Sequence, residues 1–212
     1  MARKTKEESL QTRAFILDAA ERVILRRGIS YATMADIADA AQVSRGAVYG
    51  HFKNKIELAV AMCERALALA VTPARMPGAT ALETLFDQGM YFLRLCTEPG
   101  TVQRVLQILY VQCDINEDNQ PLLEIRDRWE SQCREETAAL IREAMACGEL
   151  PANLDIGLAN LYLFSLFDGI YSTLFWTNRI PLQDRWRIAE TLYRAGFVAF
   201  TDAPQLCQQQ DG

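Results

Sequence analysis

Apolar residues recur every three or four positions along most of this 212-residue chain, and no segment alternates apolar and polar residues between turn signals. In the first such segment Ile16, Ala20, Val23 and Ile24 lie on one face of a helix. This is the period of an α-helix that buries one side, whereas a half-buried strand has a period of two. The spacing therefore predicts an all-α fold of about nine helices.

Local capping signals place the first three helices. Two arginines followed by Gly28 are typical of a helix that ends in a left-handed glycine. A Thr-x-x-Asp sequence beginning at Thr33 caps a second helix, which runs to about Ala41. Ser44 caps a third helix, which ends near Phe52. Three short helices joined by tight turns form a helix-turn-helix pattern, with the motif over about 33–52.

A fourth, connecting helix is expected over about 55–72, with Leu58, Met62 and Leu69 facing inward. Prolines and a glycine over 73–78 stop it and mark a boundary between two parts of the chain. The second part contains further turn signals that separate helical segments. Five more helices are expected, over roughly 80–96, 101–113, 121–147, 155–178 and 184–200.

Charge is shared unevenly between the two parts. Residues 1–60 hold ten basic and seven acidic residues, a net charge of +3, whereas the remaining residues carry −8. A small basic segment joined to a larger acidic one indicates separate tasks for the parts. We expect a DNA-binding domain over 1–60 and a ligand-sensing and dimerisation domain over 73–212.

The composition excludes several classes of function. His51 is the only histidine, so zinc sites with several histidine ligands are excluded. The six cysteines form no C-x-x-C pair, and no P-loop, G-x-S-x-G or H-E-x-x-H motif is present. We therefore expect no enzyme activity, no metal and no cofactor.

No membrane span or secretory signal is expected either. The most apolar run, 161–176, contains Asp168 and is shorter than the roughly 20 residues that cross a bilayer. The first residues alternate basic and acidic side chains and lack an apolar core. Reduced thiols and a cytoplasmic location are the expectation.

The third helix has the side chains of a recognition helix. A helix that enters the DNA major groove, about 12 Å wide, needs a small and polar outer face. Val48 and Phe52 are expected to point to the core. The expected outer face consists of Ser44, Arg45, Ala47, Tyr49, Gly50 and His51. Periodicity alone also fits a small helical bundle whose exposed lysines only keep it soluble.

These residues strongly resemble the DNA-binding signature of the TetR family of bacterial repressors. The resemblance rests on the sequences TMADIA at 33–38 and VSRGAVYGHFKNK at 43–55, and it is specific over roughly 5–65. The N-terminal residues, with ILDAAE at 16–21, are similar to the AcrR/MexZ-type branch that regulates efflux pumps. Farther along, CTEPG at 96–100 and GELPA at 148–152 are similar to the same branch.

The resemblance implies a set of DNA contacts. Phosphate contacts would come from Thr33, Tyr49, His51 and Lys55. Base-edge contacts would come from Ser44, Arg45 and Ala47, with Gly46 allowing a close approach. Thr33 and Ser44 would also be expected as helix caps alone, Arg45 as a solvated charge and His51 as a packing residue.

Two positions depart from the family pattern. Gln42 stands where glycine is usual in the turn, and a left-handed backbone there would cost about 1 kcal/mol. Gly50 stands where an aromatic residue is frequent, which removes a possible phosphate or sugar contact. Both departures bear on the operator sequence.

The second part is expected to form a homodimer and to hold an effector. Small residues at helical spacing indicate a close interface between helices of two protomers, and the alternative is that they pack within their own chain. They are Ser165, Gly169 and Ser172, with Asp168 at the same seam, and Ala195, Gly196 and Ala199. Aromatic and sulfur side chains could line a ligand pocket or an ordinary core. They are Phe86, Phe92, Tyr110, Trp129, Cys133, Phe164, Phe167 and Tyr171.

The sequence predicts a homodimer that binds a palindromic operator in double-stranded DNA. The resemblance implies that it is a repressor and that the operator lies near genes for a multidrug efflux pump that confers antibiotic resistance. A small-molecule effector or an anti-repressor protein would release it. The alternative is a helical ligand- or protein-binding module that has no operator.

Overall fold

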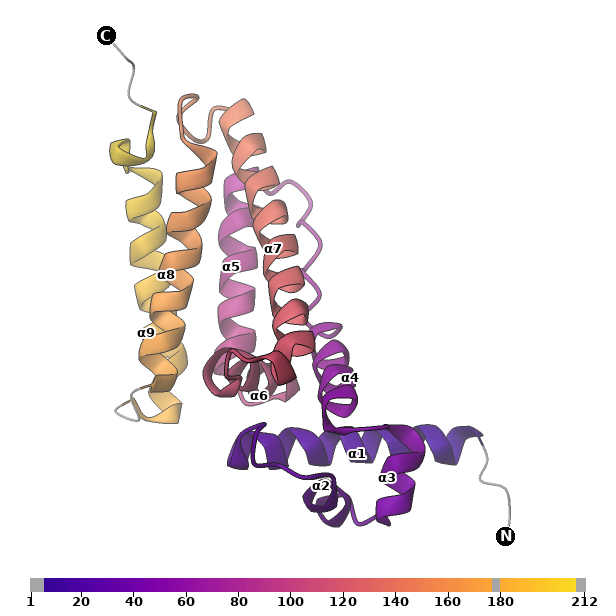
Figure 1. Ribbon diagram of the computed structural model, residues 1–212. Helices are drawn as coiled ribbons and strands as arrows, with labels where there is room; N and C mark the ends of the chain where they lie inside the picture. The colour runs from indigo at the N-terminus through magenta and orange to yellow at the C-terminus, as the bar shows by residue number, and fades with distance from the viewer. Residues whose placement is uncertain (1–5, 177–179, 209–212) are drawn as a thin grey trace. The chain divides into compact units, whose positions relative to one another are not determined.

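Nine α-helices account for most of the residues that the computed structural model describes, 6–176 and 180–208 (Figure 1). No β-strand lies among these residues, and Leu154 and Cys207 form one isolated bridge. The prediction of an all-α fold is confirmed. None of the described helices is long and apolar enough to cross a membrane.

The chain folds as two compact units. The first comprises residues 1–70 and 100–129, and the second comprises 71–99 and 130–212. The first unit contains α1 (Lys6–Arg27), α2 (Met34–Ala40), α3 (Arg45–His51), α4 (Lys55–Leu67) and α6 (Thr101–Gln107). A π-helical turn, η1 (Ile108–Gln112), continues α6, and a short 3₁₀ turn, η2 (Glu117–Asn119), precedes α7 (Gln120–Ala146).

The core of the first unit draws on distant parts of the sequence. Ile16, Ile37 and Leu58 from α1, α2 and α4 are fully buried, and Val105 of α6 and Leu122 of α7 join the same cluster. Because apolar burial contributes about 25 cal/mol per Å² of covered surface, these side chains stabilise the segment that contains the helix-turn-helix. Figure 1 shows α2 and α3 on the same side of α1.

The second unit consists of α5 (Ala81–Thr97), the C-terminal part of α7, α8 (Ile156–Trp176), α9 (Leu182–Thr201) and a 3₁₀ turn, η3 (Pro204–Leu206). Helices α8 and α9 lie side by side, and α5 packs on both (Figure 1). Phe86 of α5 lies between rings of α9, with its centroid 5.1 Å from that of Phe197 and 5.8 Å from that of Tyr193. Aromatic packing thus joins α5 to α9.

The fourth helix is shorter than its expected span. It ends at Leu67, so the prediction of a helix to about residue 72 was wrong. Tight turns follow, and Leu69, which was expected to face inward, is 59% exposed. The α conformation is disfavoured for the residue before a proline, which here is Thr72. Val71 and Thr72 are also β-branched, which lowers their helix propensity, so the end of the expected span does not favour a helix.

The segment expected as one helix over 101–113 changes type within its length. It is α-helical to Gln107 and π-helical from Ile108 to Gln112. A π turn inserts one extra residue into a turn, which rotates the side chains that follow. Side-chain periodicity could not detect this change.

Candidate nucleic-acid interface

A capping box holds the start of α2. The Thr33 Oγ1 accepts a hydrogen bond from the Asp36 amide at 3.1 Å, and the Asp36 carboxylate accepts from the Thr33 amide at 3.1 Å. The Thr33 hydroxyl also donates to that carboxylate at 2.7 Å, and Arg27 lies 2.7 Å from it. The Thr33 hydroxyl, followed by its amide and Arg27, lowers the pKa of Asp36. Thr33 is thus exposed at a capped helix start.

The turn between α2 and α3 keeps a left-handed residue without a glycine. Gln42 has a φ of 56°, and it is the only non-glycine residue with positive φ among the described residues. Hydrogen bonds from the amides of Gln42 to Asp39 O and of Val43 to Ala38 O close the turn. The left-handed backbone anticipated at this position is thus present, and such a conformation costs a residue with a Cβ about 1 kcal/mol.

Helix α3 has a buried and an exposed side, as predicted. Val48 is fully buried and Phe52 is 2% exposed, so they fix the helix on the core. Ser44 caps it, because its Oγ accepts from the Ala47 amide at 3.1 Å. Arg45 and Tyr49 are exposed on the other side, Tyr49 at 57%.

The remaining predicted DNA contacts occupy different environments. Gly46 is exposed and Ala47 is half-buried. His51 is half-buried, with its ring 6.3 Å from that of Phe52. Lys55 is also half-buried, and its ammonium donates to the Ser30 carbonyl at 3.1 Å. Lys55 therefore supports the loop that joins α1 to α2 besides carrying a positive charge.

Two further cations belong to this region and were absent from the predicted contacts. Arg13 of α1 lies over the Phe52 ring, 5.2 Å from its centroid. Lys53 is exposed between α3 and α4, and its amide donates to the Glu57 carboxylate at 2.8 Å. Arg13 could not be found from local sequence, because the contact joins residues far apart in the chain.

The residues expected to line a ligand pocket fall into both compact units. Tyr110 and Trp129 belong to the first unit, and the Tyr110 ring lies 5.8 Å from the Arg126 guanidinium. The second unit holds the other six, Phe86, Phe92, Cys133, Phe164, Phe167 and Tyr171. Burial raises the pKa of the Cys133 thiol to about 11. The Arg134 guanidinium stacks on the Phe164 ring at 4.1 Å.

The small residues expected at a dimer interface are mostly exposed. Ser165, Asp168 and Gly169 of α8 and Ala195 and Ala199 of α9 lie on the surface of the second unit, and Ser172 is half-buried. Gly196 is different, because a Cβ there would overlap the Leu166 side chain, and its carbonyl accepts from the Tyr162 hydroxyl at 3.0 Å. Gly196 therefore packs α9 against α8 within the chain.

The arrangement of α2, a tight turn and an exposed, capped α3 matches a known family. Residues 16–62 match the family model described as bacterial regulatory proteins, tetR family, and 81–184 match that of the C-terminal region of MAATS-type transcriptional repressors. The chain is 34% identical to the probable HTH-type transcriptional regulator ArpR of Pseudomonas putida over 180 residues, 80% of this chain and 83% of that protein. The chain belongs to the TetR family. This TetR-family protein is therefore a transcriptional regulator, and its family is not one of enzymes.

Solved structures of two bacterial repressors resemble it over most of the chain. The crystal structure of MexZ, a repressor responsible for antibiotic resistance in Pseudomonas aeruginosa, has a TM-score of 0.84 and 50% sequence identity, and covers 94% of this chain and 99% of its own. NalD, the secondary repressor of the MexAB-OprM multidrug efflux pump in Pseudomonas aeruginosa, has a TM-score of 0.70 and 27% identity, over 89% of this chain and 97% of its own.

Proposed function

We propose that this TetR-family regulator represses a multidrug efflux operon by binding a palindromic operator as a homodimer. The exposed side of α3, with Arg45 and Tyr49 projecting from a helix that Val48 anchors, is the observation that carries the proposal. The names of MexZ, NalD and a probable acrEF/envCD operon repressor of Escherichia coli support the choice of target genes.

In this proposal α3 lies in the major groove. Arg45 contacts a guanine, because an arginine that bonds both acceptors of guanine is the commonest specific contact in protein–DNA complexes. Ser44, Gly46 and Ala47 lie along the base edges, where small side chains permit close approach. Thr33, Tyr49, His51 and Lys55 contact phosphates and fix the position of the helix on the duplex.

Dimerisation is assigned to one face of α8 and α9. Besides the small residues already described, this face exposes Leu158 at 43%, Leu161 at 53% and Val198 at 63%. Neighbouring apolar side chains on two packed helices suit an interface in which the same surface of each protomer meets its copy. A dimer would present two α3 helices to the two halves of a palindrome.

We assign DNA binding to 1–60 and effector sensing and dimerisation to 73–212, in the cytoplasm. A small molecule among the aromatic side chains of the regulatory segment, or an anti-repressor protein, would stabilise a conformation with lower operator affinity. An effector shifts such an equilibrium only by its difference in affinity for the two states.

Fluorescence anisotropy with labelled duplexes from the DNA upstream of the protein's own gene tests the proposal. We expect one palindromic segment to bind far more tightly than a scrambled duplex of equal length, with affinity falling steeply as salt rises. Equal binding to both duplexes, or none, would contradict it. Tight binding of a small molecule or protein without salt-sensitive DNA affinity would instead support a helical binding module.

A further inference from the structure

One cation of α1 lies at the end of α3. The Arg13 guanidinium is over the Phe52 ring, 5.2 Å from its centroid. Phe52 directly follows α3, and its amide donates to the Val48 carbonyl at 3.0 Å. Arg13 is therefore held against the last turn of the helix that exposes Arg45, although it comes from a different helix of the first unit.

Arg13 has no counter-ion in the part of the chain that the structure describes. Its half-buried side chain forms no ion pair and no hydrogen bond with any described residue. Two other arginines of the first unit differ, since Arg27 pairs with Asp36 at 2.7 Å and Arg104 pairs with Glu21 at 2.8 Å. Because a partly buried charge without a counter-ion has a free-energy cost, an anion from outside the chain would bind favourably beside Arg13.

The contact with the Phe52 ring leaves the hydrogen-bonding edge of the guanidinium free. A guanidinium is planar, so it meets an aromatic ring with its face while its N–H groups point outward in its own plane. The ring therefore restrains the position of Arg13 without using its donors. Arginine commonly binds phosphate through two parallel N–H groups of this edge. A restrained guanidinium with unused donors is thus suited to a phosphate.

The residues that follow Phe52 favour the same kind of anion. Lys53 is exposed and adds a second positive charge at the end of α3. The Glu57 carboxylate is already engaged, because it accepts a hydrogen bond from the Lys53 amide at 2.8 Å. In the proposed function α3 lies in the major groove, and the phosphates of the two strands line the edges of that groove. A phosphodiester of the bound DNA therefore fits the place beside Arg13.

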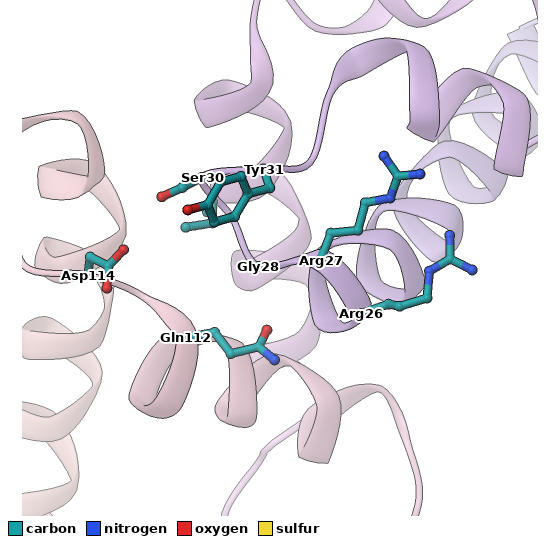
Figure 2. Close-up of a pocket in the computed structure, with 8 residues that line it drawn as sticks. Arg26, Arg27, Gly28, Ser30, Tyr31, Gln112 and Asp114 are labelled. Atoms are coloured by element: carbon teal, nitrogen blue, oxygen red, sulfur yellow. The ribbon is translucent and has the colours of Figure 1, made fainter.

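The other arginines of α1 lie elsewhere on the helix. Arg26 and Arg27 are at its C-terminal end, beside Gly28 (Figure 2). Arg22 comes nine residues after Arg13, which is about two and a half turns of an α-helix and places it on the opposite face. Arg22 is exposed and forms no ion pair with any residue that the structure describes. It therefore carries the same charge on the same helix, away from the face that meets α3.

We propose that Arg13 binds a DNA phosphate at the end of α3, so that α1 is part of the DNA interface. The Phe52 ring restrains the guanidinium, and its N–H groups donate to the phosphate oxygens. The contact lies outside the helix-turn-helix and reads no base, so it acts on the operator and on other DNA alike. The inference rests on the proposed function, because it requires α3 to bind DNA.

The test uses the full-length protein, the operator duplex and a scrambled duplex, in anisotropy titrations at several salt concentrations. Arg13→Gln should bind both duplexes about three- to fivefold more weakly, and its slope of log affinity against log salt should be smaller by about 1. Arg13→Met, which keeps an apolar stem over the ring, should behave as Arg13→Gln does. Arg13→Lys keeps the charge and should keep the slope. Arg22→Gln is the matched control and should bind as the parent protein does.

The salt dependence separates a phosphate contact from support of the fold. If Arg13 only held Phe52 in place, Arg13→Gln and Arg13→Met would lose affinity with the slope of the parent protein. That result would overturn the proposal, and so would an Arg22→Gln variant whose slope fell as far as that of Arg13→Gln. Thermal unfolding of each variant shows whether its fold is kept.

A second measurement locates the contact on the DNA. A methylphosphonate replaces one charged phosphate of the operator by a neutral group. We expect one position in each half of the operator at which this replacement weakens binding of the parent protein but not of Arg13→Gln or Arg13→Met. The absence of such a position would overturn the proposal. A parent protein that binds neither duplex would instead refute the proposed function on which the inference rests.

Discussion

Arg104 of α6 donates two hydrogen bonds to the buried carboxylate of Glu21 in α1, from Nη2 at 2.8 Å and from Nε at 3.2 Å. Arg65 of α4 reaches the other oxygen of the same carboxylate at 2.5 Å, and Glu21 is fully buried. One charge on α1 therefore holds two other helices, and this arrangement balances the cost of burying it.

Removing the charge at this junction should destabilise the first unit. Glu21→Gln keeps the size of the side chain but leaves two arginines facing a neutral amide. We expect a loss of about 2 kcal/mol in unfolding free energy, less than the roughly 3–5 kcal/mol of fully buried pairs, because both arginines are partly exposed. Asp18→Asn, which removes a half-exposed partner of Arg65, should cost less than about 1 kcal/mol. Denaturant unfolding measures the unfolding free energy of both variants. Equal losses would show that burial of the carboxylate does not determine how much its ion pair stabilises the fold.

The turn before α3 can be made more stable. Gln42→Gly should raise the unfolding free energy by up to about 1 kcal/mol, because glycine adopts positive φ without steric cost. Gln42→Ala keeps the Cβ and should give no such gain. Thermal unfolding of the two variants provides the comparison, and a less stable Gln42→Gly protein would contradict the strain assigned to this residue.

Arg45 and Lys53 should affect DNA binding in different ways. Arg45→Ala should cost about 1–3 kcal/mol on the operator and much less on a scrambled duplex, because it removes a base contact. Lys53→Ala should weaken both duplexes alike and reduce the slope of log affinity against log salt by about 1. Anisotropy titrations at several salt concentrations separate the two roles. If Lys53→Ala lowered affinity only for the operator and Arg45→Ala weakened both duplexes alike, the two roles would be reversed.

The start of α2 should lose stability in acid. The pKa of Asp36 is lower in the folded protein than in the unfolded chain, chiefly because of the Thr33 hydroxyl. The stabilisation is therefore complete above the unfolded pKa and disappears as the pH falls through the folded one, in the range below about pH 4. An NMR titration of the Asp36 carboxyl carbon should give a higher pKa in Thr33→Ala. An unchanged pKa would assign the shift to the Thr33 amide and Arg27.

The face of α8 and α9 should govern oligomeric state. Ala199→Glu places a charge at an exposed position of α9, where it would be buried in the proposed dimer. Sedimentation velocity should show monomers at concentrations at which the parent protein is dimeric. Ala139→Glu, on an exposed position of α7, is the control and should stay dimeric. A dimeric Ala199→Glu protein would show that the dimer interface lies on another surface.

Local bonds explain why much of this fold could be predicted from the sequence. The caps at Thr33 and Ser44 and the left-handed Gly28 each depend on atoms within a few residues. The exposed side of α3 could be predicted in the same way, because Val48 and Phe52 mark the buried side. Family resemblance then supplied the roles of the exposed residues, which periodicity alone left open between DNA binding and a simple bundle.

Contacts between distant residues were beyond such reasoning. Nothing near Glu21 in the sequence indicates that its carboxylate is buried, since the partners Arg65 and Arg104 are 44 and 83 residues away. The π turn after Gln107 has the same apolar spacing as an α-helix. The intrachain role of Gly196 depends on Leu166 of the neighbouring helix, which a pattern of small residues does not reveal.

The shared core of the first unit limits how this regulator can be recombined with others. A fragment that ended at Ala70 would lose Val105 and Leu122 from the core and Arg104 from Glu21. A chimaera that joins this DNA-binding segment to the sensor of another regulator should therefore carry residues 100–129 with it. Residues 100–129 are thus part of the DNA-binding unit, although residues 71–99 separate them from the rest of it in the sequence.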